Sequence, residues 1–164
     1  MSYPDPNYLR DIGEVSATFR PASVPPDLIM GTGGTEVSYL ATTVSTVGEF
    51  GLYRWDMGTK PSGPSPHFHK TISESFFILS GTVHLFDGAR WVEATAGDFL
   101  YVPQGGIHAF RNEPGEGASM LLLFAPGATR EAYFEELAKV AAEGGERPEE
   151  FWAELLARHD QYPA

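Results

Sequence analysis

The side chains best suited to chemistry lie in the middle of the chain, in the run His67-Phe68-His69, at Glu74 and at His108. Two histidines separated by one residue point to the same face of a β-strand, because side chains alternate with a period of two. Glu74 lies at an odd offset from His69 and would face the other way on an unbroken strand. A turn or bulge at 70–73 removes this conflict and lets a new strand begin with Glu74 facing inward. Three imidazoles and one carboxylate would then form a site for a divalent transition metal with open coordination positions.

Two histidines and a glutamate are by themselves also compatible with a histidine-rich surface loop beside a solvated carboxylate. A second pattern downstream favours the metal site. It reads G-x5-P-x-G-x2-H-x3-N and comprises Gly97, Pro103, Gly105, His108 and Asn112. The first pattern, extended to Gly81, reads H-x-H-x4-E-x6-G and comprises His67, His69, Glu74 and Gly81.

Together these two patterns resemble the paired motifs of the cupin superfamily, small double-stranded β-helix barrels that usually hold one metal. With its flanking strands, the resemblance covers about residues 36–126. It implies one divalent transition metal per chain (Ni, Mn, Fe, Co, Zn or Cu) held by the three histidines and Glu74. One position departs from the family pattern: Pro61 stands where the first motif usually has glycine, and Gly63 lies closer to the histidines.

Composition narrows the class of protein. A chain of 164 residues is long enough for one domain with a single core. Its 18 glycines and 13 prolines suit short strands joined by turns, and the lack of cysteine leaves His and carboxylate as the metal ligands. The formal net charge of −11 argues against nucleic acid and anionic membranes as partners. The first residues show neither the basic nor the apolar segment of a signal peptide, so we expect a cytoplasmic protein.

We predict an all-β fold for a single domain over 1–164: a double-stranded β-helix, or cupin jelly-roll barrel, at 36–126. An irregular N-terminal arm at 1–35 would lie over the barrel or a neighbouring subunit, unless it is a disordered tail. The β-branched and aromatic run 36–47 predicts the first strand. Apolar residues at helical spacing predict two C-terminal helices within 129–160, with aromatic stripes that pack on the outer face of the barrel or on a dimer mate.

Strand parity also predicts which side chains face the cavity. We expect substrate contacts from four apolar residues: Trp55, Phe76, Ile78 and Phe110. The cavity should be apolar apart from the metal ligands, which suits a flat aromatic or phenolic ligand. A sugar phosphate would instead require an inward-facing Arg or Lys.

Outward-facing Phe77 and Leu79, together with the aromatic helices, offer more apolar surface than a small monomer normally exposes, so we expect a homodimer. The remaining histidines, His84 and His159, are interpreted as surface residues.

Within the cupins, the chain looks most like single-barrel proteins of the quercetinase-like group. The residues that carry this resemblance are the Glu-x-Phe-Phe-Ile-Leu run from Glu74, the Phe-Arg-Asn ending of the second motif, and Leu-Phe-Ala-Pro-Gly leading into a Phe-Glu-Glu-Leu helix. The resemblance implies O₂-dependent cleavage of an enol-bearing flavonol ring, with the metal binding the hydroxylate and Glu74 taking its proton as a general base.

Two other functions remain open. One is a metal-dependent cyclase or isomerase that acts on an aromatic polyketide-like substrate without O₂. The other is a non-catalytic cupin that uses the barrel to bind a small molecule, and the lack of a DNA-binding segment beside the barrel disfavours a regulator.

Overall fold

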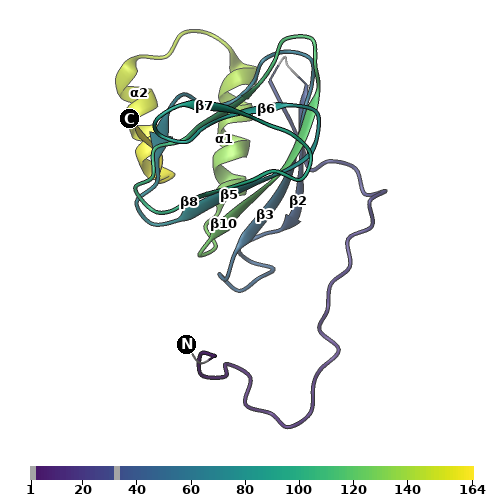
Figure 1. Cartoon of the computed structure of the whole chain (residues 1–164). Coiled ribbons are helices and arrows are strands. Elements are labelled where there is room, and N and C mark those ends of the chain that lie inside the picture. Colours follow the sequence, from purple (N-terminus) through teal and green to yellow (C-terminus); the bar gives the residue numbers. More distant parts are fainter. Residues whose placement is uncertain (1–2, 32–33) are drawn as a thin grey trace.

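The computed structural model describes residues 3–31 and 34–164 and shows a mostly β fold with two C-terminal helices (Figure 1). The largest sheet has six strands in the order β1-β2-β3-β10-β5-β8. Their bounds are β1 Leu28–Met30, β2 Thr35–Ala41, β3 Gly51–Met57, β10 Ala118–Ala125, β5 Ser73–Ser80 and β8 Phe99–Val102. Every pair in this sheet is antiparallel.

A second sheet of three strands faces the first. It runs β7-β6-β9, with bounds β7 Trp91–Ala94, β6 Val83–Phe86 and β9 Ala109–Asn112. The Trp55 ring on β3 lies 6.1 Å from the Phe110 ring on β9, and Phe76 on β5 lies 5.8 Å from Phe110. Aromatic side chains therefore join the two sheets through a common core, as in a jelly roll.

Strand parity explains how the core forms. On β3 the buried residues Tyr53, Trp55 and Met57 alternate with the more exposed Leu52, Arg54 and Asp56. On β5, Glu74, Phe76 and Ile78 are buried, whereas Phe77 is 41% exposed. This alternation confirms the predicted inward and outward faces of both strands.

The strands do not form one continuous closed barrel. In the part of the chain that the structure describes, they form three separate sheets, the third being the pair β4 (His67–Phe68) and β11 (Tyr162–Pro163). An isolated bridge between His67 and His108 links β4 to the start of β9. The predicted β fold with two C-terminal helices is thus confirmed, although the sheets of the described residues do not close into one continuous barrel.

The strand predicted at 36–47 is shorter than expected, because β2 ends at Ala41 and a series of turns follows. The Thr42 backbone N–H donates to Ser45 Oγ, and the Ser45 backbone N–H donates to Thr42 Oγ1. Hydroxyl groups thus bind the local backbone and replace the strand that β-branched residues alone would favour.

The N-terminal arm does not cover the sheets. Residues 3–27 are irregular and mostly exposed, and the chain runs away from the sheets in Figure 1. The last part of the predicted arm instead forms β1, which pairs with β2 at the edge of the large sheet.

The two predicted helices are α1 (Arg130–Glu143) and α2 (Glu149–Arg158). In the described residues, neither is long and apolar enough to cross a bilayer. Tyr133 and Phe134 of α1 are buried, and the Phe134 ring lies 5.0 Å from Trp55 and 5.3 Å from Tyr53. The aromatic face of α1 therefore packs on the inner side of β3, which corrects the expectation of packing on the outer face.

Candidate metal centre

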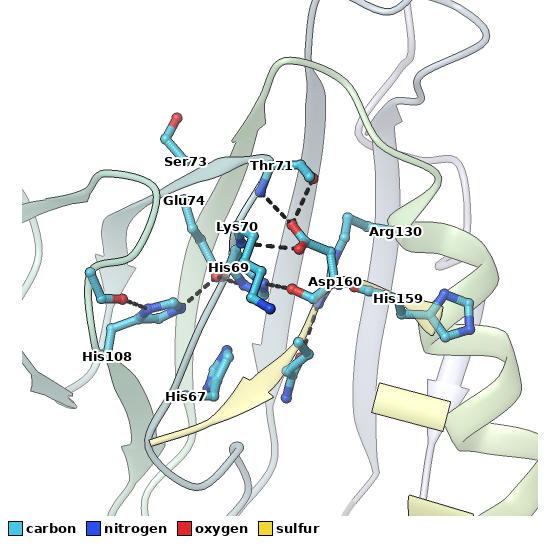
Figure 2. A network of polar contacts seen from close by, with 12 residues as sticks. His67, His69, Lys70, Thr71, Ser73, Glu74, His108, Arg130, His159 and Asp160 are labelled. Carbon is cyan, nitrogen blue, oxygen red and sulfur yellow. Dashed lines mark hydrogen bonds and ion pairs between the residues drawn. The ribbon is translucent and has the colours of Figure 1, made fainter. Parts of the chain in front are cut away.

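The four predicted ligands converge in one buried cluster. His67, His69, Glu74 and His108 each offer one ligand atom, and these atoms all lie within 4.8 Å of one another. Each of the four residues is at most 4% exposed. Figure 2 shows Glu74 reaching towards the rings of His69 and His108.

The backbone explains this convergence. His67 lies on β4, and the bend at Lys70–Thr71 turns the chain into β5, so that Glu74 enters facing the same side. His108 directly precedes β9, and its backbone exchanges two hydrogen bonds with His67, from His67 N–H at 3.0 Å and from His108 N–H at 2.9 Å. The turn predicted between the histidines and Glu74 is thereby confirmed.

All three imidazoles are oriented in the same way. Their Nδ1 atoms lie near backbone carbonyl oxygens: His67 at 2.9 Å from Ser65, His69 at 2.5 Å from Asp160, and His108 at 3.0 Å from Gly106. A carbonyl oxygen can only accept, so each Nδ1 carries a proton. A neutral ring then presents the lone pair of Nε2 to the cluster, which is the usual orientation of metal-bound histidines. Without a cation, Nε2 of His69 or His108 donates to Glu74 only when that ring carries a second proton.

Electrostatics show that the cluster attracts positive charge. His69 and His108 place Nε2 at 3.1 Å and 2.8 Å from the same Glu74 oxygen. Burial would raise the pKa of Glu74, but hydrogen bonds from His108 and His69 hold it well below its usual range. Burial opposes protonation of His108, yet the hydrogen bond and charge of Glu74 raise its pKa. Burial, followed in size by the charge of His108, lowers the pKa of His67 to about 4. A bound cation would replace the protons that Glu74 shares with His69 and His108, because the carboxylate and the Nε2 atoms all face the same buried space.

The C-terminal segment fixes one of these rings from behind. The Asp160 carbonyl faces His69 Nδ1, while its carboxylate accepts hydrogen bonds from Lys70 N–H at 3.0 Å and from Thr71 N–H and Oγ1–H at 2.9 and 2.7 Å. Next to it, β11 pairs with β4. We call residues 159–164 the C-terminal clasp, because they hold the strand and the turn that present His67 and His69 (Figure 2).

A cavity of about 730 Å³ opens beside the cluster. Its lining includes His67 and Glu74, and it extends to Trp55 and Phe110. Apolar side chains of both helices complete the wall: Tyr133, Phe134, Leu137, Val140, Trp152 and Leu156. The helical aromatic residues thus belong to the cavity and not to a packing surface alone, and the cavity has the size of an ordinary small-molecule site.

Two of the four residues predicted to contact substrate line the cavity, and two do not. Trp55 and Phe110 line the cavity. Phe76 and Ile78 are fully buried, and neither lies among the described residues that line it. Phe76 packs behind the cluster, with its ring 5.9 Å from that of His108.

The remaining histidines lie away from the cluster. His84 Nε2 lies 2.8 Å from Glu113, and His159 Nε2 lies 2.6 Å from Glu136. Each side chain is only 13% exposed, so both are better described as partly buried than as surface residues.

Arg130 is a cavity residue that the sequence interpretation missed. It is the first residue of α1, is only 4% exposed and lines the same cavity as His67 and Glu74. The expectation that the cavity is apolar apart from the metal ligands is therefore wrong. A usable signal existed, since a cation in the first turn of a helix opposes the helix dipole and needs another reason to be there.

Comparison with known proteins agrees with this geometry. Residues 53–124 match the sequence profile of the cupin domain family. This part of the chain is therefore similar to a cupin domain. The match begins on β3 and ends on β10, so it includes all four residues of the cluster. A sequence search against curated proteins gave no match.

Several solved structures share this fold. A predicted oxalate decarboxylase from Thermotoga maritima has a TM-score of 0.59 and 21% identity, covering 67% of this chain and 99% of that one. KdgF from Halomonas sp. has a TM-score of 0.52 and 14% identity, covering 60% and 84%. The polyketide cyclase RemF from Streptomyces resistomycificus has a TM-score of 0.50 and 24% identity, covering 59% and 68%. At these identities, the likeness shows the cupin fold alone.

Proposed function

We propose that this cupin binds one divalent transition metal through His67, His69, Glu74 and His108 and acts on a small aromatic or phenolic molecule. The observation that carries the proposal is the common orientation of the three imidazoles. With their Nδ1 protons held by backbone carbonyls, three imidazoles turn Nε2 toward one carboxylate in a buried space, an arrangement that a divalent cation would fit. Imidazole ligands suit Ni, Fe, Cu and Zn, and the carboxylate keeps Mn and Co possible.

Aromatic lining supports the proposed substrate class. Trp55, Phe110 and Phe134 border the cavity that reaches His67 and Glu74. A flat ring can pack against these side chains while a hydroxyl group on it meets the cluster. When bound, the metal would supply Lewis acidity towards a substrate oxygen and, in a dioxygenase, the electron chemistry that O₂ requires.

Within this proposal, Glu74 acts as the general base. Glu74 is ionised in the cluster and lines the cavity wall, where a substrate hydroxyl bound beside it would lie. A carboxylate with a low pKa is a weak base, so the hydroxyl would also have to be acidified by the metal. Glu74 would accept the hydroxyl proton and leave an enolate or phenolate oxygen, which is the activated form of the substrate. We propose O₂-dependent ring cleavage of an enol-bearing aromatic substrate, the reaction of the quercetinase-like group.

The likeness to a polyketide cyclase supports a second proposal, in which the same site cyclises or isomerises an aromatic substrate without O₂. A third possibility is a cupin that binds such molecules without turnover. The three differ in their use of oxygen and in turnover, which makes them experimentally distinct.

The test combines metal reconstitution with oxygen-electrode measurements. Protein loaded separately with each of the six metals is given a panel of flavonols and related phenols, in air and under argon. The dioxygenase proposal expects oxygen uptake that matches product formation and stops under argon. Glu74→Gln should retain metal and lose turnover by about 10²–10⁴-fold, the usual contribution of a general base. Glu113→Gln, in a glutamate paired with His84 outside the cluster, is the matched control.

The contrary outcomes are equally clear. Equal conversion under argon would refute the dioxygenase and support the cyclase or isomerase. Tight binding of phenols without turnover on any metal would support the binding function.

A further inference from the structure

Two buried nitrogen donors on the cavity wall lack a partner. Among the described residues, four buried side-chain atoms make no hydrogen bond: Thr43 Oγ1, Trp55 Nε1, Ser119 Oγ and Arg130 Nε. The two nitrogen donors, on Trp55 and Arg130, both belong to residues that line the cavity. A buried donor without an acceptor is destabilising, so a ligand that accepts from both would satisfy a real deficit.

In the described part of the chain, Arg130 also lacks a direct ion pair, although the charges of Glu74 and Asp160 favour its protonated form. Its Nη1 donates to the His159 carbonyl at 2.8 Å, and its Nη2 donates to Gln161 Oε1 at 3.3 Å. Both acceptors are neutral, and within residues 3–31 and 34–164 no carboxylate forms an ion pair with this guanidinium. The remaining contacts are with aromatic faces, for example that of Tyr133 at 4.3 Å.

A buried charge normally has a partner of opposite sign, because transfer from water is costly. Burial lowers the pKa of Arg130, in keeping with this cost, although arginine stays charged in proteins. The cation–π contacts offset part of the cost but leave the Nε donor unpaired. An anionic group in the cavity would supply the direct ion pair that Glu74 and Asp160 do not form with this guanidinium.

The two donor-bearing residues both contact the ring of Phe134. Phe134 lies 5.0 Å from the Trp55 ring and 5.7 Å from the Arg130 guanidinium, and all three residues line the cavity. His67 and Glu74 line the same cavity, whose volume of about 730 Å³ can hold an aromatic ring with two polar substituents.

We propose that Arg130 and Trp55 form an anion-accepting subsite, and that the substrate is an aromatic acid whose carboxylate binds there. This inference rests on the proposed function for the rest of the substrate, namely the ring and the hydroxyl that meets the metal. Arginine favours carboxylates because its planar group donates along two directions, and the indole N–H adds a third donor.

Calorimetric titration with a pair of matched probes tests the subsite. The probes are 2-naphthoate and its neutral counterpart 2-naphthalenemethanol, each titrated into the full chain loaded with Zn²⁺ and again into the metal-free chain. We expect the wild type to bind the carboxylate about 10- to 100-fold more tightly than the alcohol in both forms, the usual gain from hydrogen bonds to a charged group. Arg130→Gln should remove this preference and change alcohol binding by less than about threefold.

Two further variants make the result specific. Arg158→Gln replaces an arginine that pairs with Glu136 outside the cavity, and it should behave as the wild type. Trp55→Phe keeps an aromatic ring but removes the N–H, and it should lower the carboxylate preference several-fold. Circular dichroism checks that each variant is folded. If Arg130→Gln does not fold because it no longer holds His159 and Gln161, the Trp55→Phe result decides, and an unchanged preference there overturns the inference.

The remaining outcomes separate this inference from the proposed function. A wild type that does not distinguish the probes, or an Arg130→Gln protein that retains the preference, refutes the subsite. If the preference exists only with Zn²⁺ and is lost in His69→Ala but not in Arg130→Gln, the carboxylate binds at the metal, and the metal proposal stands without the subsite. If the preference depends on Arg130 and the protein binds no metal, the subsite stands and the proposed function fails.

Discussion

Replacing Asp160 by Asn should loosen the C-terminal clasp and weaken the metal centre that it supports. Asp160 adopts a positive φ of 56°, which Asn tolerates as well, so the change isolates the carboxylate. The carboxylate accepts three hydrogen bonds from Lys70 and Thr71. An Asn oxygen can serve only one side of this arrangement, and its NH₂ group then faces an N–H donor.

The expected magnitude follows from these contacts. Loss of at least one hydrogen bond to a charged group costs about 1.5–3 kcal/mol, and we take about 2 kcal/mol because Asp160 is partly exposed. For a chain of this length, that corresponds to a decrease in Tm of about 4–8 °C in thermal unfolding followed by circular dichroism. Metal affinity, measured by competition with a chelating dye, should fall about tenfold, because groups that orient metal-bound histidines commonly contribute 10- to 100-fold.

A matched control separates stability from metal binding. Asp98 accepts hydrogen bonds from Thr95 N–H at 2.7 Å and Oγ1–H at 3.3 Å in a turn outside the cluster. Asp98→Asn should therefore lower Tm but leave metal affinity unchanged. If Asp160→Asn and Asp98→Asn bind metal within twofold of each other, the reasoning about the clasp is wrong.

Three further predictions concern acid stability, packing and assembly. Burial would raise the pKa of Asp160, but its hydrogen bonds lower it, so its stabilisation is complete above about pH 4 and is lost as the pH falls further. The Tm difference between wild type and Asp160→Asn should thus stay constant from pH 7 to 5 and shrink below about pH 4, and a constant gap at pH 3 would contradict this. Gly63→Ala should destabilise by at least about 3 kcal/mol in urea unfolding, because its Cβ would lie 1.9 Å from the Phe110 carbonyl oxygen at a φ of +139°. Gly13→Ala, in open space, should have little effect, and equal stability of the two would refute the steric argument. We also propose a homodimer through the outward face of β5, so light scattering should give twice the chain mass for wild type and one chain mass for Phe77→Glu, whereas a monomeric wild type would refute it.

The sequence was informative where the determining interactions are local. His67 and His69 share a face because of strand parity, and the bend before Glu74 follows from its odd offset. The same rule identified the buried face of β3 and β5.

Long-range contacts were beyond such reasoning. The Asp160 carbonyl meets His69 across 91 residues, through a strand of only two residues that has no periodic pattern. The spacing of apolar residues in α1 revealed an apolar face but not the strand that this face packs against. The contact between α1 and Trp55 on β3 therefore could not be inferred. For Arg130, the unfavourable position of a cation in the first turn of a helix was a local signal, but the cavity that it lines follows only from tertiary packing. At Thr42 and Ser45, local hydroxyl bonds outweighed strand propensity.

Metal content measured on natively isolated protein tests the central claim most directly. Elemental mass spectrometry of wild type, His69→Ala and His84→Ala should be performed after exhaustive dialysis against metal-free buffer. We predict about one divalent transition metal per chain in the wild type and in His84→Ala, whose histidine pairs with Glu113 outside the cluster. His69→Ala should contain almost none, because it loses one of four ligands whose atoms lie within 4.8 Å. Full metal content in His69→Ala, or no metal uptake by the wild type from any of the six ions, would contradict the assignment of this cluster as a metal centre.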